Sequence, residues 1–317
     1  MTSGPRRWTL VVCCACLLSS SVAQQSAAEF KSAITQALQA GETARAEELS
    51  VKAIARWPQD PDFVHYRGLA HFRSNRLEAA ATDLEAARKM APQDADTIFD
   101  LGLVEMARMR YESAAKLFAE ALKDPRRRRM GIAHLLLGRA LQNSNQSEPA
   151  IARFKTALQL EPGLPLGHYH LGYAYQSIGD TRSAIEEYRK ELAHTTGSAE
   201  VFYQLGHALI EAGGFAEAAE RLRQSLALDA NRADAQYDLG KVLLLQGDVE
   251  AAVPALEKAI ALQPDSASAH FQLARALQKK GDKERAHSEM EKFLALKRKQ
   301  KTTGGMATGR NPTGCNQ

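Results

Sequence analysis

Apolar positions along most of the chain recur every three or four residues, which is the spacing of one face of an amphipathic helix. The pattern also repeats over a longer interval. A leucine–glycine pair stands at 101–102, 137–138, 171–172, 205–206 and 239–240, so successive pairs are 34 or 36 residues apart. A fixed period of this length is typical of a solenoid built from one helical unit.

Placing these glycines at the eighth position divides the chain into eight units: 27–60, 61–94, 95–130, 131–164, 165–198, 199–232, 233–266 and 267–300. The twentieth position is alanine in every unit: Ala46, Ala80, Ala114, Ala150, Ala184, Ala218, Ala252 and Ala286. Small residues at both positions allow two helices to cross closely. Each unit is therefore predicted to be a helix–turn–helix hairpin, and the fold class to be an all-α solenoid.

Each unit also carries a predicted turn between its two helical stretches. Most of these turns hold a residue that tolerates a left-handed backbone: Gly41, Asn75, Asn145, Gly179, Gly213, Gly247 and Gly281. Asp180, Asp248 and Asp282 follow their turns directly and are expected to cap the second helix. A hairpin of this kind cannot bury its apolar face alone, so the units are expected to stack.

These features together resemble the tetratricopeptide repeat family. The unit ADAQYDLGKVLLLQGDVEAAVPALEKAIALQP, 233–264, carries the leucine–glycine pair, the turn glycine, two family alanines and the final proline. The resemblance implies a right-handed superhelix whose concave surface is built from the first helix of each pair. It also implies a protein or peptide as the partner bound there.

In this register the resemblance assigns several side chains to the concave surface. The predicted partner-binding residues are Phe99, Leu103, Tyr169, Tyr173, Tyr203, His207, Tyr237, Lys241, Phe271 and Arg275. Tyrosine is a common anchor in protein interfaces, so the tyrosines are the strongest of these candidates. The alternative interpretation is that the aromatic residues serve packing within the array.

A run of four arginines, 126–129, interrupts the third unit and is expected to lie in an extended loop. One interpretation of Arg126, Arg127, Arg128 and Arg129 is a solvated charged face. The other is electrostatic contact with lipid headgroups, an acidic partner or a cell-wall polymer. The predicted function is a protein-interaction scaffold that binds a partner segment in its groove. The alternative function is an envelope assembly or anchoring factor that contacts an anionic surface, such as lipid headgroups or an acidic polymer, through basic loops.

The N-terminal residues predict export. Arg6 and Arg7 precede a short apolar run, and small residues end at Ala23, as in a secretory signal peptide. Cleavage near Ala23 would leave a periplasmic or extracellular protein, whereas retention would leave an anchor. The expected domains are a signal peptide over 1–23, the solenoid over 24–300 and a disordered tail over 301–317.

Composition limits the remaining function classes. Removing Arg6 and Arg7 leaves 39 basic residues against 37 acidic ones, which does not favour nucleic acid as a partner. The stretch HYHLGYAYQSIGD contains His168 and His170, but residues two apart on a helix point about 200° apart and cannot share one metal ion. No enzyme motif is present in the sequence. We therefore expect no catalysis, no cofactor and no metal.

Overall fold

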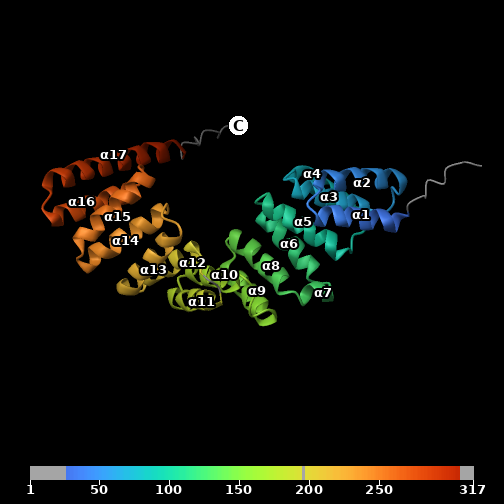
Figure 1. Cartoon of the computed structure of the whole chain (residues 1–317), viewed down its shortest axis with the longest axis horizontal. Helices are drawn as coiled ribbons and strands as arrows, with labels where there is room; N and C mark the ends of the chain where they lie inside the picture. The colour runs from blue at the N-terminus through green and yellow to red at the C-terminus, as the bar shows by residue number, and fades with distance from the viewer. Residues whose placement is uncertain (1–25, 195–196, 308–317) are drawn as a thin grey trace, which may run out of the picture. The chain divides into compact units, whose positions relative to one another are not determined.

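The computed structural model describes residues 26–194 and 197–307, and their regular structure is entirely helical (Figure 1). The all-α fold class is confirmed. The expected signal peptide over 1–23 lies outside the described residues. None of the described helices is both long enough and apolar enough to cross a lipid bilayer.

The chain divides into two compact units between Arg108 and Met109. The first unit contains α1 (Ala27–Gln39), α2 (Thr43–Arg56), α3 (Pro61–Arg73), α4 (Leu77–Met90) and α5 (Ala95–Ala107). The second unit begins with α6 (Tyr111–Ala121), α7 (Pro125–Arg128), α8 (Gly131–Asn143), α9 (Ser147–Leu160), α10 (Gly167–Ser177) and α11 (Thr181–His194). It continues with α12 (Ala199–Glu211), α13 (Phe215–Leu228), α14 (Ala233–Gln246), α15 (Val249–Leu262), α16 (Ala267–Lys280) and α17 (Lys283–Ala307). The predicted repeat 95–130 is therefore divided between the two compact units.

The eighth-position glycines lie where the two helices of a pair cross. A Cβ atom added to Gly172 would lie 2.9 Å from the ring of Tyr188 and 3.2 Å from the carbonyl oxygen of Ala184. A Cβ atom on Gly138 would lie 2.6 Å from the ring of Phe154. Both of these rings are fully buried. The predicted close crossing is confirmed, and the large side chain that fills it comes from the second helix.

The twentieth-position alanines are the other half of this contact. Seven of them are completely buried: Ala46, Ala80, Ala114, Ala150, Ala184, Ala218 and Ala252. The eighth, Ala286, is half-buried in α17, the last described helix. A buried position against a neighbouring backbone leaves no volume for a longer side chain.

The turns also follow the prediction. The seven glycine and asparagine positions all have positive φ, and the third unit places Met109 in the same conformation at φ +57°. A left-handed backbone is costly for a residue with a long side chain, so Met109 is the strained member of the set. The expected caps are confirmed, because Asp180, Asp248 and Asp282 each accept a hydrogen bond from a backbone N–H three residues later.

Two segments differ from the prediction. Helix α17 extends through Ala307, although order was expected to end at 300. The run from Leu296 to Lys301 contains good helix formers and no proline, so nothing in it ends the helix. The remainder of the expected tail, 308–317, lies outside the described residues. The arginine run is also not an extended loop, because Pro125–Arg128 forms the short helix α7, capped by Asp124.

We expect Ala218→Leu to lower the free energy of unfolding by about 1–3 kcal/mol, because the longer side chain overpacks a fully buried site. Urea denaturation followed by circular dichroism measures the change. Ala216→Leu is the matched control, since Ala216 is exposed on the same helix. Equal stability of the two variants would contradict the assigned helix crossing.

Candidate functional site

The first helices of successive pairs lie on the more closely spaced side of the second unit. Each one contacts the next along the series α8, α10, α12, α14 and α16, in addition to its own second helix. The corresponding contact between successive second helices in the described part of this unit is weaker. The array is therefore curved with its first helices on the inner side, as the family resemblance implied.

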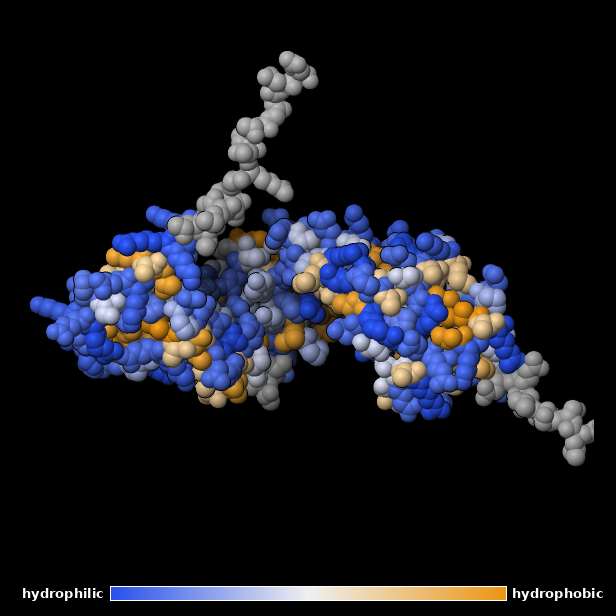
Figure 2. Space-filling view, turned by 90° about the horizontal axis from the view of Figure 1, so that it is seen from above, coloured by the Kyte–Doolittle hydropathy of each residue, from blue (hydrophilic) through white to orange (hydrophobic). Residues whose placement is uncertain are grey.

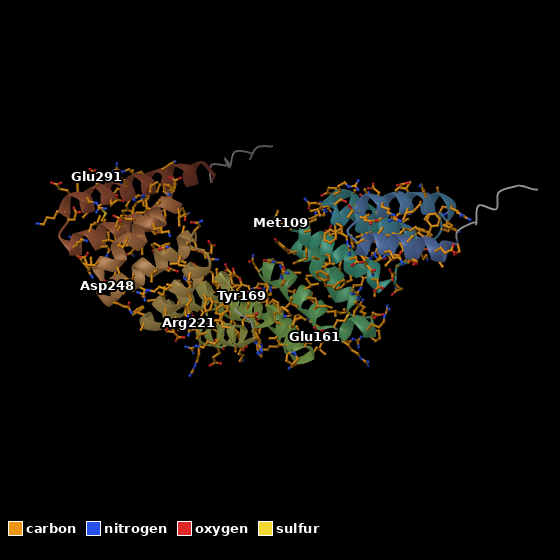
Figure 3. The ribbon with its side chains drawn as sticks, in the orientation of Figure 1. Met109, Glu161, Tyr169, Arg221, Asp248 and Glu291 are labelled. Atoms are coloured by element: carbon orange, nitrogen blue, oxygen red, sulfur yellow. The ribbon has the colours of Figure 1, made fainter. Side chains whose placement is uncertain are left out.

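A row of aromatic rings follows this inner side. Tyr169, Tyr203, Tyr237 and Phe271 occupy equivalent places on α10, α12, α14 and α16, and all four are half-buried. The three tyrosines pack against the core of the unit while part of each ring stays at the surface. Tyr173, one turn after Tyr169, is 45% exposed. Tyr169 is labelled in Figure 3.

Two residues that the sequence analysis did not select hold these rings in place. Glu200 accepts a hydrogen bond of 3.4 Å from the hydroxyl of Tyr169. Arg232 forms a 2.8 Å ion pair with Glu200, and its guanidinium lies 4.7 Å from the ring centre of Tyr203. The signal for these residues was weak, because Glu200 and Arg232 stand beside helix starts, where charged residues are common. Their contacts join consecutive first helices into one surface.

Burial keeps the phenol groups of this row protonated. Burial and the neighbouring Glu200 carboxylate raise the pKa of Tyr169 to about 12. Burial and Asp238 also raise the pKa of Tyr203 above its ordinary value. Both hydroxyls therefore remain neutral at physiological pH. The hydroxyl of Tyr169 donates to Glu200 and can accept a hydrogen bond from a ligand, whereas the hydroxyl of Tyr203 can donate or accept one.

The polar members of the predicted set lie beside the rings. His207 on α12 is 2.8 Å from Asp238 on α14, and its ring centre is 5.9 Å from that of Tyr203. The hydrogen bond to Asp238 raises the pKa of His207. Lys241 is half-buried and Arg275 is exposed. The inner side thus combines aromatic surface with three basic side chains.

Phe99 and Leu103 are the predicted binding residues that lie outside the second unit. Both belong to α5 in the first unit, whereas the other eight predicted residues belong to the second unit. Phe99 is also only 6% exposed, so it offers little surface to a ligand. The prediction of Phe99 as a binding residue is wrong. Although Phe99 has the same position in its repeat as Tyr169, its ring packs inside the first unit.

The four arginines lie at and just after α7. Arg126, Arg128 and Arg129 are exposed and Arg127 is half-buried. The guanidinium of Arg128 donates hydrogen bonds to the carbonyl oxygens of Leu122 and Lys123. Arg128 therefore helps to fasten α7 to the end of α6.

The histidines of HYHLGYAYQSIGD serve packing. His168 is 2.6 Å from Glu187 and stacks on His194, with ring centres 5.7 Å apart. His170 stacks on Phe154, and burial together with the charge of Arg139 lowers its pKa to about 4. Across the described ranges, no cluster of three histidine, cysteine, aspartate or glutamate side chains is arranged to hold a metal ion.

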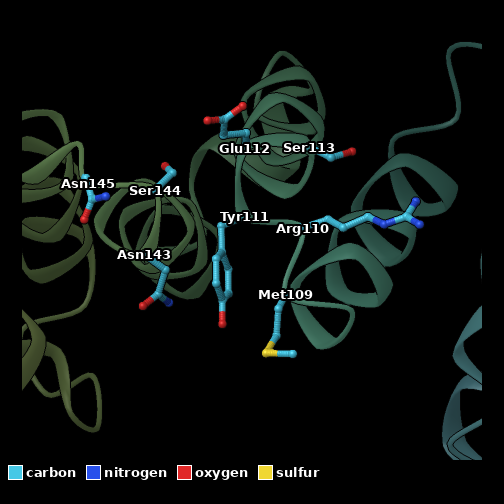
Figure 4. Close-up of a pocket in the computed structure, with 8 residues that line it drawn as sticks. All are labelled: Met109, Arg110, Tyr111, Glu112, Ser113, Asn143, Ser144 and Asn145. Carbon is cyan, nitrogen blue, oxygen red and sulfur yellow. The ribbon is translucent and has the colours of Figure 1, made fainter. Parts of the chain in front are cut away.

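A separate pocket of about 490 Å³ lies at the turns of the second unit (Figure 4). Its side chains come from two consecutive turns: Met109, Arg110, Tyr111, Glu112, Ser113, Asn143, Ser144 and Asn145. On the face seen in Figure 2, apolar residues reach the surface as separate small areas between polar side chains. The turn pocket is polar and shares no residue with the tyrosine row.

Family models described as tetratricopeptide repeat match the chain over most of its length. The matched residues are 33–95, 67–129, 99–145, 167–190, 203–267 and 243–301. The chain belongs to the tetratricopeptide repeat family. This agrees with the helix pairs, the glycine crossings and the turn geometry.

Among known proteins, the chain is similar to BBSome complex member BBS4 of Bos taurus and of Mus musculus, at 30% identity over 109 and 110 residues. Each match covers 34% of this chain and about a fifth of the relative. Among solved structures, MamA is similar at 30% identity with a TM-score of 0.50, covering 52% of this chain and 97% of MamA. The Cut9–Hcn1 complex is similar at 19% identity with a TM-score of 0.59, covering 78% and 49%.

YrrB, described as a tetratricopeptide repeat protein with an unusual peptide-binding site, is similar at 21% identity with a TM-score of 0.52, covering 57% of this chain and 93% of YrrB. At this level of identity, Cut9–Hcn1 and YrrB share the fold with this chain. Family membership supports a protein-interaction scaffold, and members of the family are generally non-catalytic.

We expect His207→Gln to change the pH dependence of stability. The pKa of His207 is raised in the folded state, so its contribution is fully present below about pH 6.5 and is lost as the pH rises through the folded pKa. The native chain should therefore exceed the variant in free energy of unfolding at about pH 5.5, with a smaller difference at about pH 8.5. His287→Gln, at an exposed histidine of α17, serves as the control. A difference that grows with pH would contradict this assignment.

Proposed function

We propose that the tyrosine face binds an extended or helical segment of a partner protein. This face consists of Tyr169, Tyr173, Tyr203 and Tyr237, with His207, Lys241, Phe271 and Arg275 beside them. The observation that carries the proposal is the row of half-exposed aromatic rings on consecutive first helices. Rigid aromatic side chains lose little conformational entropy on binding and supply large contact areas.

The contacts around the rings support a preformed binding surface. The ion pair between Arg232 and Glu200 fixes the side chains that lie against Tyr203 and Tyr169. The pair between His207 and Asp238 joins α12 to α14 a second time, further along the same two helices. A surface that is ordered before binding avoids part of the entropy cost of association. The neutral hydroxyls offer hydrogen bonds to a peptide backbone, and the basic side chains favour a partner with some acidic residues.

We expect simultaneous replacement of Tyr169, Tyr203 and Tyr237 by alanine to abolish partner capture from a native extract, with bound proteins identified by mass spectrometry. Circular dichroism checks that the helical content is unchanged. Because these rings also touch the core, Tyr173→Ala is a second variant whose side chain is mostly outside it. Each variant should capture less partner protein than the native chain. Unchanged capture by both variants would contradict the proposal. A fall in helical content of the triple variant would instead assign those three rings to the core.

The exposed arginines at α7 favour a second candidate function, contact with an anionic surface such as lipid headgroups or an acidic polymer. Capture through these arginines should weaken steeply between low and high salt, because exposed charges are screened beyond a Debye length of about 8–10 Å at physiological ionic strength. Capture through the tyrosine face should weaken only slightly. Salt dependence therefore separates the two functions.

We also propose that the protein is exported and works outside the cytoplasm, since the N-terminal sequence has the three parts of a signal peptide. Expression of the full chain in its native host, followed by N-terminal sequencing, tests this. The expected mature N-terminus is Gln24. A protein that begins at Met1 and remains in the cytoplasm would refute export, and one that begins at Met1 in a membrane fraction would indicate a retained anchor.

A further inference from the structure

A groove with a different composition runs along the second-helix side of the second unit. It lies between α6 and α9, with α7 at one end and α8 beneath, and has a volume of about 610 Å³. A neighbouring hollow of about 370 Å³ continues it and shares Ala119, Leu137 and Arg153. No residue of the tyrosine face lines either part. We call the two parts together the α6–α9 groove.

The floor of the groove is apolar. Leu122 and Leu137 line it from the end of α6 and from α8, and they are 8% and 2% exposed. Leu160, at the end of α9, also lines the groove and is 41% exposed. Apolar side chains at the bottom of an open trough favour a ligand that places an aliphatic or aromatic group there.

The rim of the groove is mainly basic, and Glu112 is the acidic side chain in its lining. Lys123, Arg129 and Arg153 are all exposed, and none has a carboxylate within ion-pairing distance in the described part of the chain. Some other cations of the second unit pair with a carboxylate of a neighbouring helix pair, as in Arg189–Glu217, Lys280–Glu250 and Arg285–Glu257. These three rim cations therefore have no ion-pairing carboxylate among the described residues and can meet the carboxylates of a ligand.

The end of the groove is held in a fixed position. Arg128 donates to the carbonyl oxygens of Leu122 and Lys123, at 3.3 and 3.1 Å, which ties α7 to α6. The Nε2 atom of His134 lies 3.0 Å from the carbonyl oxygen of Arg128 and donates to it, which ties α7 to α8. Glu161 accepts the N–H of Gly131 at 2.7 Å, which joins α8 to the end of α9.

His134 supplies an independent sign of a site. It lines the groove, its ring is only 4% exposed, and its Nδ1 atom has no hydrogen-bond partner among the described residues. Buried polar side-chain atoms normally have one. A buried hydrogen-bonding atom of a residue that lines the groove is therefore not used by the packing of the array.

We propose that the α6–α9 groove is a second binding site, for a partner segment that combines acidic side chains with bulky apolar ones. The carboxylates would meet Lys123, Arg129 and Arg153, while the apolar side chains reach Leu122, Leu137 and Leu160. A flat bilayer surface could touch the rim but not a floor that is 2–8% exposed at two of its leucines. A polypeptide can place both kinds of side chain in one trough, because neighbouring residues point in different directions.

The test uses the full chain and a short fluorescein-labelled peptide of alternating glutamate and leucine, with fluorescence anisotropy as the readout. Arg129→Glu combined with Arg153→Glu should weaken binding at least tenfold. The matched control, Arg223→Glu with Lys258→Glu, makes the same change of charge at exposed sites on α13 and α15 and should bind normally. Leu160→Gln should also weaken binding without a change in helical content.

Two comparison peptides separate charge from apolar contact. A glutamate–serine peptide and a glutamine–leucine peptide should each bind more weakly than the glutamate–leucine peptide. Equal binding of the glutamate–serine peptide would show that charge alone suffices and would overturn the proposal. Unchanged affinity of the Arg129→Glu, Arg153→Glu variant would also overturn it.

Two further arms locate the site and the class of ligand. Replacement of Tyr169, Tyr203 and Tyr237 by alanine should leave binding of the glutamate–leucine peptide unchanged. If this triple variant lost binding, the peptide would bind at the tyrosine face. That result would overturn the second site without affecting the proposed function. Vesicles of phosphatidylglycerol and phosphatidylcholine should not compete with the peptide. Binding of these vesicles with no binding of the peptide would replace the proposal with a surface contact.

Discussion

The close crossing of two helices in each pair fixes the rotation of the first helix about its axis. That rotation sets the directions in which its other side chains point. Once Gly172 faces the second helix, the helical rotation of about 100° per residue places Tyr169 about 60° and Tyr173 about 100° from that contact. The first ring is accordingly half-buried and the second is 45% exposed. The same geometry recurs at Gly206 and Gly240, where Leu222 and Leu256 fill the crossing. The tyrosine row is therefore a direct result of a backbone contact that only glycine allows.

The two sides of the second unit present different surfaces because one is built from first helices and the other from second helices. First helices contact one another along the series and form a nearly continuous surface, so rings on neighbouring helices can be held by shared partners such as Arg232. Second helices are farther apart, and the space between α6 and α9 remains as a trough. The extra residues around α7 contribute basic side chains to that trough, which regular units of 34 residues do not have.

The sequence predicted the fold well because its strongest signals were local. Gly172 and Ala184 marked a crossing, and Asp248 marked a helix start, without knowledge of any distant contact. The candidate site was predicted less completely. Phe99 and Tyr169 have the same position in their repeats, so the sequence predicted both as binding residues. In the structure Phe99 is buried and Tyr169 is only half-buried. Arg232 and Glu200 were missed because their roles depend on contacts between neighbouring units, and a charged residue near a helix end has many ordinary explanations.

The ion pairs between neighbouring second helices have a mechanical consequence. Pairs such as Arg189–Glu217 and Arg285–Glu257 are partly exposed, so each contributes little energy and can break and re-form readily. The apolar contacts at the crossings lie within each pair and would be unaffected by such changes. A force applied along the second unit would therefore alter its curvature before it unfolded a helix. Small changes in curvature can therefore occur while each helix pair of the second unit stays intact.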